Sequence, residues 1–398
     1  MDILSNRILE MTPSATVELA GKIADLKAQG VDILSFSVGE PDFPTPKNII
    51  EAAKVAMDQG FTKYTAAAGI MELREAVCEK FKKDNGLEYS TNQIIVTTGA
   101  KQAIYNALMA ICNPGDEVII PTPCWVSYVE MVKLTGAVPV LVEAFGEDGF
   151  IPKLENLKAA VSDKTKAILF NSPNNPTGAV YDADTLKGIG QLALENDFWL
   201  VSDEIYEALV YDGAEHFSVA ALCPEVKDKC IIINGVSKSY SMTGWRVGYA
   251  AGPAKTIKGM SSLQGHSTSN ATSIAQKAAV EALRGPQESV GIMHDEFARR
   301  RKVMIDRLNA MPGIECADVK GAFYTFPKVS ALYGKSAGKW TIKDSSDLAA
   351  YLLEEAHIAV VPGVAYEAPE YLRLTYASSM EEIVEGMDRM ERCINALK

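Results

Sequence analysis

The chain has 398 residues, of which 47% are hydrophobic and 23% charged, so it is long enough for two domains and ordinary for a folded protein. Its formal net charge of −12 argues against general binding to nucleic acids or anionic membranes, because phosphate groups repel an acidic surface. A local basic pocket for a small anionic ligand remains compatible with this charge.

Seven cysteines are dispersed along the chain without a Cys-x-x-Cys pair. We therefore expect neither a disulfide framework nor a zinc site, and a reducing cytoplasm suits this pattern best. The first five residues have no basic segment followed by an apolar stretch, which predicts no signal peptide. No apolar run approaches the roughly 20 residues that cross a bilayer, so we expect no membrane contact.

The first elements along the chain are expected to be mostly helical. Residues 14–29 carry apolar side chains at helical spacing and end before Gly30. Residues 33–38 predict a short strand, and a rigid loop with three prolines follows from Gly39. The same spacing predicts further helices at 47–58, 71–83 and 101–111.

From residue 94 onward, short β-branched runs bounded by turn residues alternate with helical stretches. Several runs are apolar throughout, as expected for strands covered on both faces. The predicted strands are Ile94–Thr97, Glu117–Ile120, Val138–Val142, Lys166–Phe170, Trp199–Val201, Cys230–Ile233 and Val247–Ala251. Helices between the strands predict a mostly parallel sheet with right-handed crossovers.

The composition changes after a charged helix expected around residues 286–310. After this helix the sequence predicts a shorter α+β region. Its last helix begins at Met380 and is rich in Glu and Met. We therefore predict a large α/β domain at 45–288 with a mostly parallel seven-stranded sheet. A smaller α+β domain is expected to combine the N-terminal arm, 1–44, with residues 289–398.

Polar residues follow five of the predicted strands, at the carboxyl ends where ligands bind in open α/β sheets. They are Gly99-Ala100-Lys101 at a helix start, Trp125, Asn175, Asp203 with Tyr206, and Lys238. Each alone has an ordinary explanation as a helix entry, a core ring, a cap or a solvated lysine. Together they predict a site, because helix N–H groups bind phosphate and a buried lysine can attack an aldehyde.

The segment from Ser237 to Tyr249 resembles the lysine signature of class I aminotransferases, pyridoxal phosphate (PLP) enzymes of fold type I. Other segments match further motifs of that family in the family's order: 64–69, 123–128, 171–178, 202–206 and 371–377. The resemblance runs from about residue 10 to the end. It is nearest to the bacterial aspartate aminotransferase branch that also contains prephenate-active members.

The resemblance implies that PLP forms a Schiff base with Lys238, whose amine then transfers a proton at the substrate. Asp203 would pair with the pyridine nitrogen and keep the ring protonated. Tyr206 and Asn175 would hydrogen-bond the ring's phenolic oxygen. Trp125 would stack on the ring, and Trp125 and Asn175 would also contact the substrate.

The phosphate of PLP would be bound by the backbone amides of the helix start from Gly99 to Lys101, with Arg246 and Ser237. The family usually has a hydroxyl residue three positions before the lysine, where this chain has Gly235. From that position we therefore expect a phosphate contact through the backbone alone.

Tyr64 would reach the phosphate of a neighbouring subunit. That role would make a homodimer, with active sites at the interface, the active unit. A buried structural tyrosine is the alternative interpretation of the same residue.

Substrate recognition is implied on two sides. Arg373 would grip the α-carboxylate with a bidentate fork, assisted by the backbone of Gly39. Residues 264–270, where the best-known aspartate aminotransferases place an arginine for the side-chain carboxylate, contain no arginine. In the branch that this chain resembles, Lys101 would take that role with help from Thr16.

We therefore expect an aminotransferase that moves the amino group of L-aspartate to 2-oxoglutarate by a ping-pong scheme, acting on small amino and keto acids. A prephenate, aromatic or broad-specificity aminotransferase of the same fold is the alternative. Prephenate-active relatives can carry a basic residue where this chain has Thr12, which makes prephenate the lesser option.

Other classes fit less well. Lys101 and the motif at 174–178 weigh against another PLP enzyme of the same fold, such as a kynurenine or aromatic aminotransferase or a C–S lyase. We also do not expect a PLP-binding regulator joined to a DNA-binding domain, because the resemblance begins near residue 10 and the chain is acidic. The Gly188-x-Gly190 pattern lies in a helical stretch and follows no strand, so no nucleotide site is predicted. The histidines are scattered without ligand spacing, which predicts no metal site: His216, His266, His294 and His357.

Overall fold

The computed structural model describes residues 3–398. Residues 1 and 2, which belong to the predicted small domain and to the segment with no predicted signal peptide, lie outside the described part. The centre of the structure is a seven-stranded sheet of order β2-β8-β7-β6-β5-β3-β4. Its strands are β2 (Ile94–Thr97), β3 (Glu117–Thr122), β4 (Val138–Glu143), β5 (Thr165–Asn171), β6 (Trp199–Asp203), β7 (Cys230–Gly235) and β8 (Gly248–Ala251).

Only β8 runs against its neighbours in this sheet: it pairs antiparallel with β2 and β7, and the remaining pairs are parallel. All seven predicted strands are present; five of them extend one or two residues beyond the predicted bounds, and β8 begins one residue later than predicted. The predicted α/β fold class with a mostly parallel sheet is confirmed. The parallel strands bring their carboxyl ends to one edge, where the ligand site of such sheets lies.

Successive residues of the buried strands face two separate hydrophobic cores. Ile94 and Val96 belong to one core, while Ile95 between them belongs to the other. This alternation follows from the period of two in a strand, and it explains why these strands are apolar at every position.

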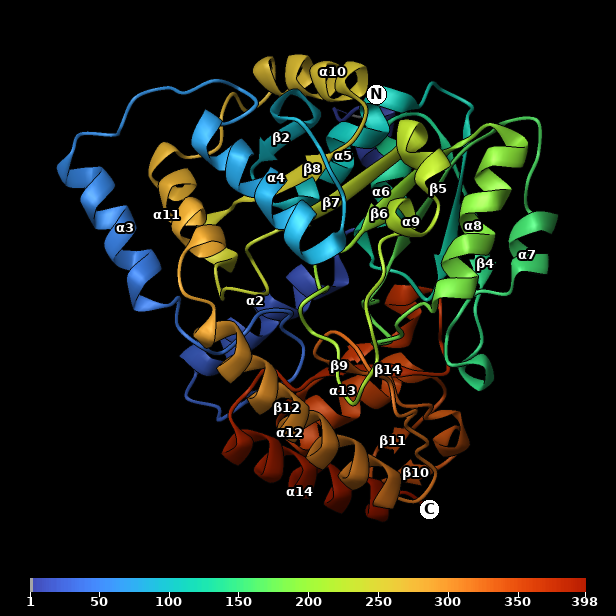
Figure 1. Ribbon diagram of the computed structural model, residues 1–398. Helices are drawn as coiled ribbons and strands as arrows, with labels where there is room; N and C mark the ends of the chain where they lie inside the picture. The colour runs from blue at the N-terminus through green and yellow to red at the C-terminus, as the bar shows by residue number, and fades with distance from the viewer. Residues whose placement is uncertain (1–2) are drawn as a thin grey trace.

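Helices cover both faces of the sheet (Figure 1). One face packs against α4 (Met71–Asn85), α8 (Ala183–Asn196) and α11 (Ser273–Arg284). The other packs against α5 (Ala100–Ile111), α6 (Ser127–Leu134) and α10 (Ala254–Gly265). The layered arrangement leaves the strand ends as the natural place for polar side chains.

The glycines of the Gly188-x-Gly190 pattern lie inside α8 and serve packing. A Cβ at Gly188 would collide with Leu154, and one at Gly190 would lie 2.9 Å from the sulfur of Cys223. The prediction that this pattern follows no strand and opens no helix is confirmed.

The N-terminal segment agrees with the expected pattern with two differences. The predicted helix at 14–29 is α2 (Ala15–Ala28), and the predicted helix at 47–58 is α3 (Lys47–Asp58). A short helix, α1 (Asn6–Leu9), precedes them. The strand predicted at 33–38 shortens to β1 (Leu34–Ser35), which pairs with β12 (Ile358–Ala359) near the other end of the chain.

The C-terminal part forms a smaller α+β region. In Figure 1 its helices, coloured orange to red, gather below the seven-stranded sheet. They are α12 (Glu288–Ala310), α13 (Ser345–Glu355) and α14 (Met380–Ala396). The associated strands are β9 (Tyr324–Thr325), β10 (Ser336–Ala337), β11 (Trp340–Thr341), β13 (Val361–Pro362) and β14 (Leu372–Thr375), of which β13-β14-β9 form an antiparallel sheet.

Short elements complete the chain. They are α7 (Leu154–Ala159), α9 (Val219–Leu222) and 3₁₀ turns at Thr91–Gln93, Gly146–Asp148, Pro224–Lys229, Thr243–Trp245, Ser330–Leu332 and Gly363–Tyr366. No helix among residues 3–398 is long and apolar enough to span a membrane.

We keep the division into a large domain at 45–288 and a small domain of 1–44 with 289–398 as a proposal. It is supported by the buried side chains, because Phe36 belongs to the same hydrophobic core as residues of α12, α13 and α14. The pairing of β1 with β12 also ties the N-terminal segment to the C-terminal region. Tyr206 joins that core from the large-domain side, so the two proposed domains are in contact.

Candidate active site

A cavity of about 370 Å³ opens at the carboxyl ends of the parallel strands. It collects residues that follow β3, β5, β6 and β7, the start of α5, the N-terminal segment and one residue of β14. Twelve of the predicted site residues line it: Thr16, Gly39, Ala100, Lys101, Trp125, Asn175, Asp203, Tyr206, Ser237, Lys238, Arg246 and Arg373. Gly99 lies directly beside them, whereas Tyr64 is not part of the lining.

Lys238 enters the cavity three residues after β7 ends. Its Nζ donates a hydrogen bond of 2.5 Å to the backbone carbonyl of Gly39. Burial lowers the pKa of Lys238 to about 8; the Glu40 carboxylate opposes this shift, and Arg246 and Arg373 add to it. An amine with this pKa is partly unprotonated near neutral pH, as a nucleophile or a general base requires.

Asp203 is the last residue of β6 and is only 3% exposed. One carboxylate oxygen accepts a 2.6 Å hydrogen bond from the hydroxyl of Tyr128, and the other accepts a 3.2 Å bond from the N–H of Ile205. Burial raises the pKa of Asp203 to about 6, and these two hydrogen bonds oppose the increase. The carboxylate is therefore held in a fixed orientation and gains most from a cationic partner in the cavity.

Tyr128 is a site residue to which sequence reasoning gave no role. It lies in α6 one turn after Trp125, and the two rings meet edge to face with centroids 5.4 Å apart. The signal was present, because both residues belong to the segment 123–128 that matches a family motif. Trp125 precedes α6, so the turn that leads into the helix, closed by a 2.9 Å hydrogen bond from the N–H of Tyr128 to the carbonyl of Trp125, brings the two rings together.

Arg373, in β14, is 2% exposed and reaches the cavity from the C-terminal region. Its guanidinium donates to the amide oxygen of Asn175 at 3.2 Å and to the carbonyl of Ser37. Its Nε is buried and has no hydrogen-bond partner among the described residues. A buried donor left unsatisfied in this way points to a ligand acceptor such as a carboxylate.

Tyr206 and Tyr324 form a hydroxyl pair at 2.8 Å on the same side of the cavity. Tyr324 was also missed by sequence reasoning, because β9 contributes it from a distant part of the chain and no local pattern marks it. A Cβ at Gly39 would lie 2.6 Å from its hydroxyl oxygen, so a larger residue at position 39 would displace this hydroxyl from its pair with Tyr206.

The start of α5 forms the opposite end of the cavity. Gly99 caps this twelve-residue helix with a φ of 82°, and a Cβ there would lie 2.6 Å from a guanidinium nitrogen of Arg246. Gly248 of β8 is equally constrained, because its Cβ would collide with the backbone of Ala100. Since the first N–H groups of a helix lack intrahelical acceptors, this end fits an anion held between backbone donors and Arg246.

Gly235, which stands where the family usually has a hydroxyl residue, lies close to β8. A Cβ at this position would lie 3.0 Å from both the Cα of Gly248 and the carbonyl oxygen of Val247. A larger residue would therefore require β7 and β8 to shift by a few tenths of an ångström. Ser237, which is buried and lines the cavity, is the nearby residue that offers a hydroxyl.

Lys101 lies near the mouth of the cavity, where its Nζ is 4.7 Å from the ring centroid of Trp125. Burial lowers its pKa and the charge of Arg246 adds to the effect. Thr16 lies close by, its hydroxyl 3.1 Å from that of Ser14. Thr12 does not line the cavity; its N–H donates instead to Glu130 at 3.3 Å.

Tyr64 is 91% exposed and remains apart from the cavity of its own chain. The alternative interpretation as a buried structural tyrosine is therefore wrong. Its implied role across a subunit interface stays a prediction.

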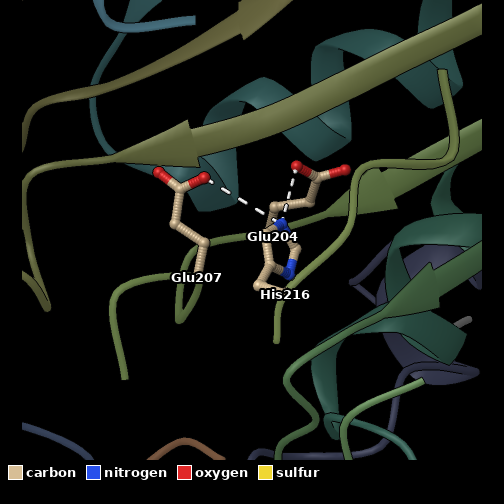
Figure 2. Close-up of side chains that lie close together, drawn as sticks. All are labelled: Glu204, Glu207 and His216. Carbon is tan, nitrogen blue, oxygen red and sulfur yellow. Dashed lines mark hydrogen bonds and ion pairs between the residues drawn. The ribbon is translucent and has the colours of Figure 1, made fainter. Parts of the chain in front are cut away.

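His216 departs from the expectation that the histidines are scattered. Its Nε2 lies 3.2 Å from Glu204 and 4.0 Å from Glu207, so the three side chains form a compact group with ligand-like spacing (Figure 2). The sequence gave no indication of this group, because a loop of eleven residues separates Glu204 from His216. The expectation that the histidines lie apart from other potential ligands is therefore wrong for His216. The expected absence of a metal site stays a prediction.

The balance of charge decides what the cavity can hold. Four cationic side chains line it, and within residues 3–398 none of them forms an ion pair with a carboxylate: Lys101, Lys238, Arg246 and Arg373. The carboxylates in the lining are Asp203 and Glu40. Arg373 is buried and Lys238 is half-buried, whereas Lys101 and Arg246 are exposed. Four cations without a carboxylate partner suit the cavity to a ligand or ligands with several anionic groups.

Comparison with known proteins agrees with this geometry. The family model for class I and II aminotransferases matches residues 31–390. The chain belongs to this family. It is 49% identical to an aspartate aminotransferase of Bacillus sp. (strain YM-2), with 99% of each chain covered, and 46% identical to an aspartate/prephenate aminotransferase of Cereibacter sphaeroides, with 98% of each covered.

Solved structures give the same result. The aspartate aminotransferase of Rhizobium meliloti matches with a TM-score of 0.96 and 41% identity over 100% of both chains. The Thermus thermophilus aspartate aminotransferase with maleate matches with a TM-score of 0.93 and 44% identity, over 99% of this chain and 100% of the other. Aminotransferases of this family depend on PLP, which is therefore the cofactor of this enzyme.

The residues present fit PLP. The cofactor carries a phosphate, an aldehyde and a basic ring nitrogen, and the cavity offers an anion site at α5, the amine of Lys238 and the carboxylate of Asp203. The unsatisfied Nε of Arg373 leaves a further donor for a substrate carboxylate. Each group of the cofactor thus has a side chain or helix end of matching chemistry.

Proposed function

We propose that the protein is an aspartate aminotransferase that transfers the amino group of L-aspartate to 2-oxoglutarate. The observation that carries the proposal is the number of unpaired cations in one cavity. There are more of them than one phosphate and one carboxylate would need as partners. Arg373 and Lys101 supply two separate sites for the two carboxylates of a dicarboxylic substrate. Relatives named aspartate aminotransferase, and a neighbour solved with the dicarboxylate maleate, support the same choice.

Bound PLP supplies an electron sink for the charge left when a proton leaves the substrate Cα. Lys238 would hold the cofactor through its aldehyde carbon, and its amine is the group placed to remove and return the proton at the substrate Cα. Asp203, oriented by Tyr128, holds a proton on the ring nitrogen. Tyr206 and Asn175 donate hydrogen bonds to the phenolic oxygen of the ring.

The remaining cofactor contacts are assigned by position. Trp125 covers the ring face, and its indole lies on the lining of the cavity. The phosphate is held by the backbone at Gly99, Ala100 and Lys101, by the guanidinium of Arg246 and by Ser237. These groups bind and orient the cofactor and take no part in proton transfer.

Substrate selection is assigned to the two ends of the amino acid. Arg373 and the backbone of Gly39 bind the α-carboxylate, beside Asn175. Lys101, with Thr16, binds the side-chain carboxylate near Trp125. A lysine makes a less directional contact than an arginine, so some activity toward other amino acids is expected.

A homodimer is proposed as the active unit, with Tyr64 completing the phosphate site of the partner. Its 91% exposure in a single chain supports this, because a large aromatic side chain gains by burial in an interface. We propose a cytoplasmic location, supported by the seven cysteines, all of which are free.

The decisive experiment compares kcat/KM for aspartate, alanine, tyrosine and prephenate with 2-oxoglutarate as acceptor. We expect aspartate to be preferred, and its addition without a keto acid to bleach the visible absorption of the holoenzyme. Rates for alanine equal to or above those for aspartate would contradict the assignment of Lys101. Preference for prephenate would instead favour the activity named for the Cereibacter relative.

A further inference from the structure

A second group of buried charges lies directly behind Asp203. Glu204, the next residue, is 1% exposed and does not line the cavity; its carboxylate lies in the group shown in Figure 2. One oxygen accepts hydrogen bonds from the hydroxyls of Ser202 at 3.0 Å and Ser218 at 2.9 Å. The other oxygen faces the Nε2 of His216 at 3.2 Å.

Glu207, the other carboxylate of the group, has its own partners. Lys80, whose side chain is 7% exposed, forms an ion pair with one oxygen, and Asn85 donates a 2.9 Å hydrogen bond to the other. Asp84 lies 3.9 Å from the Lys80 ammonium. Every carboxylate oxygen of Glu204 and Glu207 is therefore already occupied by a donor, so a metal ion would have to displace these donors.

His216 is the cationic partner that remains for Glu204. Lys80 pairs with Glu207, and within residues 3–398 no lysine or arginine forms an ion pair with Glu204. Burial alone would lower the pKa of His216, yet the hydrogen bond and charge of Glu204, with the charge of Glu207, raise it above its usual value against the opposing charge of Lys80.

The other titratable groups near Glu204 are uncharged near neutral pH. The phenols of Tyr89 and Tyr249 and the thiol of Cys230 lie close to it, and burial raises the pKa of each far above neutrality. The charge that Asp203 experiences from behind is therefore set by Glu204 and by the protonation of His216.

The backbone couples this group to the cavity. Successive side chains of an extended segment point to opposite sides, so Glu204 anchors the same peptide that presents Asp203. The N–H of Glu204 donates to the carbonyl of Ile233 at 2.9 Å, and the N–H of Ile205 donates to the carboxylate of Asp203 at 3.2 Å. The negative charge of Glu204 also raises the pKa of Asp203.

We propose that Glu204 and His216 are positioning residues for Asp203, and that protonated His216 neutralises Glu204 so that Asp203 stays ionised. This rests on the proposed function, in which Asp203 holds the proton on the cofactor's ring nitrogen. Loss of the proton from His216 exposes the charge of Glu204 and strengthens the negative field behind the cofactor. The pair thus links the protonation state of a buried histidine to the electronic properties of the site.

The test is the pH titration of the visible absorption of the holoenzyme in two variants of the pair. His216→Gln removes a positive charge, keeps a donor and leaves the negative charge of Glu204 without its partner. We therefore expect its titration midpoint to rise by about 0.5–1 pH unit, as expected for one charge at this range in a partly screened interior. Glu204→Gln removes a negative charge and, with it, the hydrogen bond and charge that keep His216 protonated. Both charges of the pair are then lost, so we expect its midpoint to stay close to that of the wild type.

Ser218→Ala is the matched control, because it removes one hydrogen bond to Glu204 without a change in charge. Its midpoint should equal that of the wild type. Should His216→Gln fail to fold, His216→Asn supplies the same loss of charge with a smaller side chain. A purely structural role predicts shifts of the same sign in both charge variants, or none, and either result would overturn the proposal.

The same experiment separates this inference from the proposed function. If the protein is not an aminotransferase, aspartate will leave the visible absorption of the wild type unchanged. If only the role of the Glu204–His216 pair is wrong, aspartate will bleach the wild-type absorption while both variants titrate as the wild type does.

Discussion

Two groups of buried charges lie on opposite sides of the end of β6, and they differ in how the charges are paired. In the cavity, Lys238 and Arg373 have no carboxylate partner within residues 3–398. In the group behind it, Lys80 pairs with Glu207 and His216 with Glu204. The charges behind the cavity are paired within the protein. The cations of the cavity are unpaired and are therefore the ones available to bind a ligand.

The contrast has an energetic basis. Burying a charge without a partner costs several kcal/mol of folding free energy. Such a charge is found where the binding of a ligand of opposite charge offsets that cost. A fully paired group needs no ligand and contributes by fixing the backbone. Variants in the cavity should therefore change activity, whereas variants in the paired group should change stability or pH dependence.

The largest effect is expected for Lys238→Ala. Loss of the amine that acts as both nucleophile and base should reduce kcat by about 10⁴-fold or more. Steady-state assay with aspartate and 2-oxoglutarate measures this, with circular dichroism as the check on folding. Retention of a tenth of the wild-type activity would place the catalytic amine elsewhere.

Lys80→Ala tests the paired group. Removal of Lys80 leaves Glu207 buried without its cation, which should lower the free energy of unfolding by about 3–5 kcal/mol. Urea unfolding followed by tryptophan fluorescence measures the change. The control is Lys54→Ala, whose exposed pair with Glu51 should contribute about 1 kcal/mol or less; equal losses in both variants would refute the contrast.

Attachment of PLP to the apoprotein should follow the ionisation of Lys238. Burial lowers the pKa of Lys238 from 10.5 to about 8, so the free-amine fraction at neutral pH is about two orders of magnitude larger than in an ordinary lysine. The attachment rate should therefore increase with pH and level off above about 8. Stopped-flow absorbance measures it, and a rate that rises without a plateau to pH 10 would contradict the shift.

Arg373→Ala should lower kcat/KM by an amount equivalent to about 2–5 kcal/mol, because a bound carboxylate would lose its buried fork. The loss should be alike for aspartate and alanine, which share the α-carboxylate. A loss confined to aspartate would show that Arg373 reads the side chain instead.

The smallest effect is expected for Lys101→Ala. Lys101 is more exposed than Arg373 and makes a less directional contact, so the preference for aspartate over alanine should fall by about tenfold. Activity with alanine should stay close to that of the wild type. An equal loss for both substrates would assign Lys101 to the cofactor rather than to selection.

Much of this architecture could be predicted from the sequence, because the seven central strands are apolar runs bounded by turn residues. Lys238 and Asp203 could be placed as well, since both lie at or just beyond strand ends. The short strand β1 was predicted too long, because its pairing with β12 depends on a contact more than 320 residues away. Local pattern carries no information on such a contact.

The missed residues have different causes. Tyr324 reaches Tyr206 from a strand 118 residues further along the chain, so its neighbours give no local signal. His216 is only twelve residues from Glu204, but the path of the loop between them decides that they meet. The orientation of Tyr128 toward Asp203 depends on how α6 packs against the sheet. The sequence could therefore identify the chemical groups that the cofactor needs, and the fold was required to show what holds them in place.

The anion site at α5 owes its shape to atoms that are absent. A Cβ at Gly99 would meet the guanidinium of Arg246, one at Gly235 would crowd β8, and one at Gly248 would collide with the backbone of the helix start. Libraries designed to alter the choice of amino acid should therefore keep these three positions fixed and vary Lys101 and Thr16. Such a library changes the residues that contact the substrate and leaves the residues that bind the cofactor unchanged.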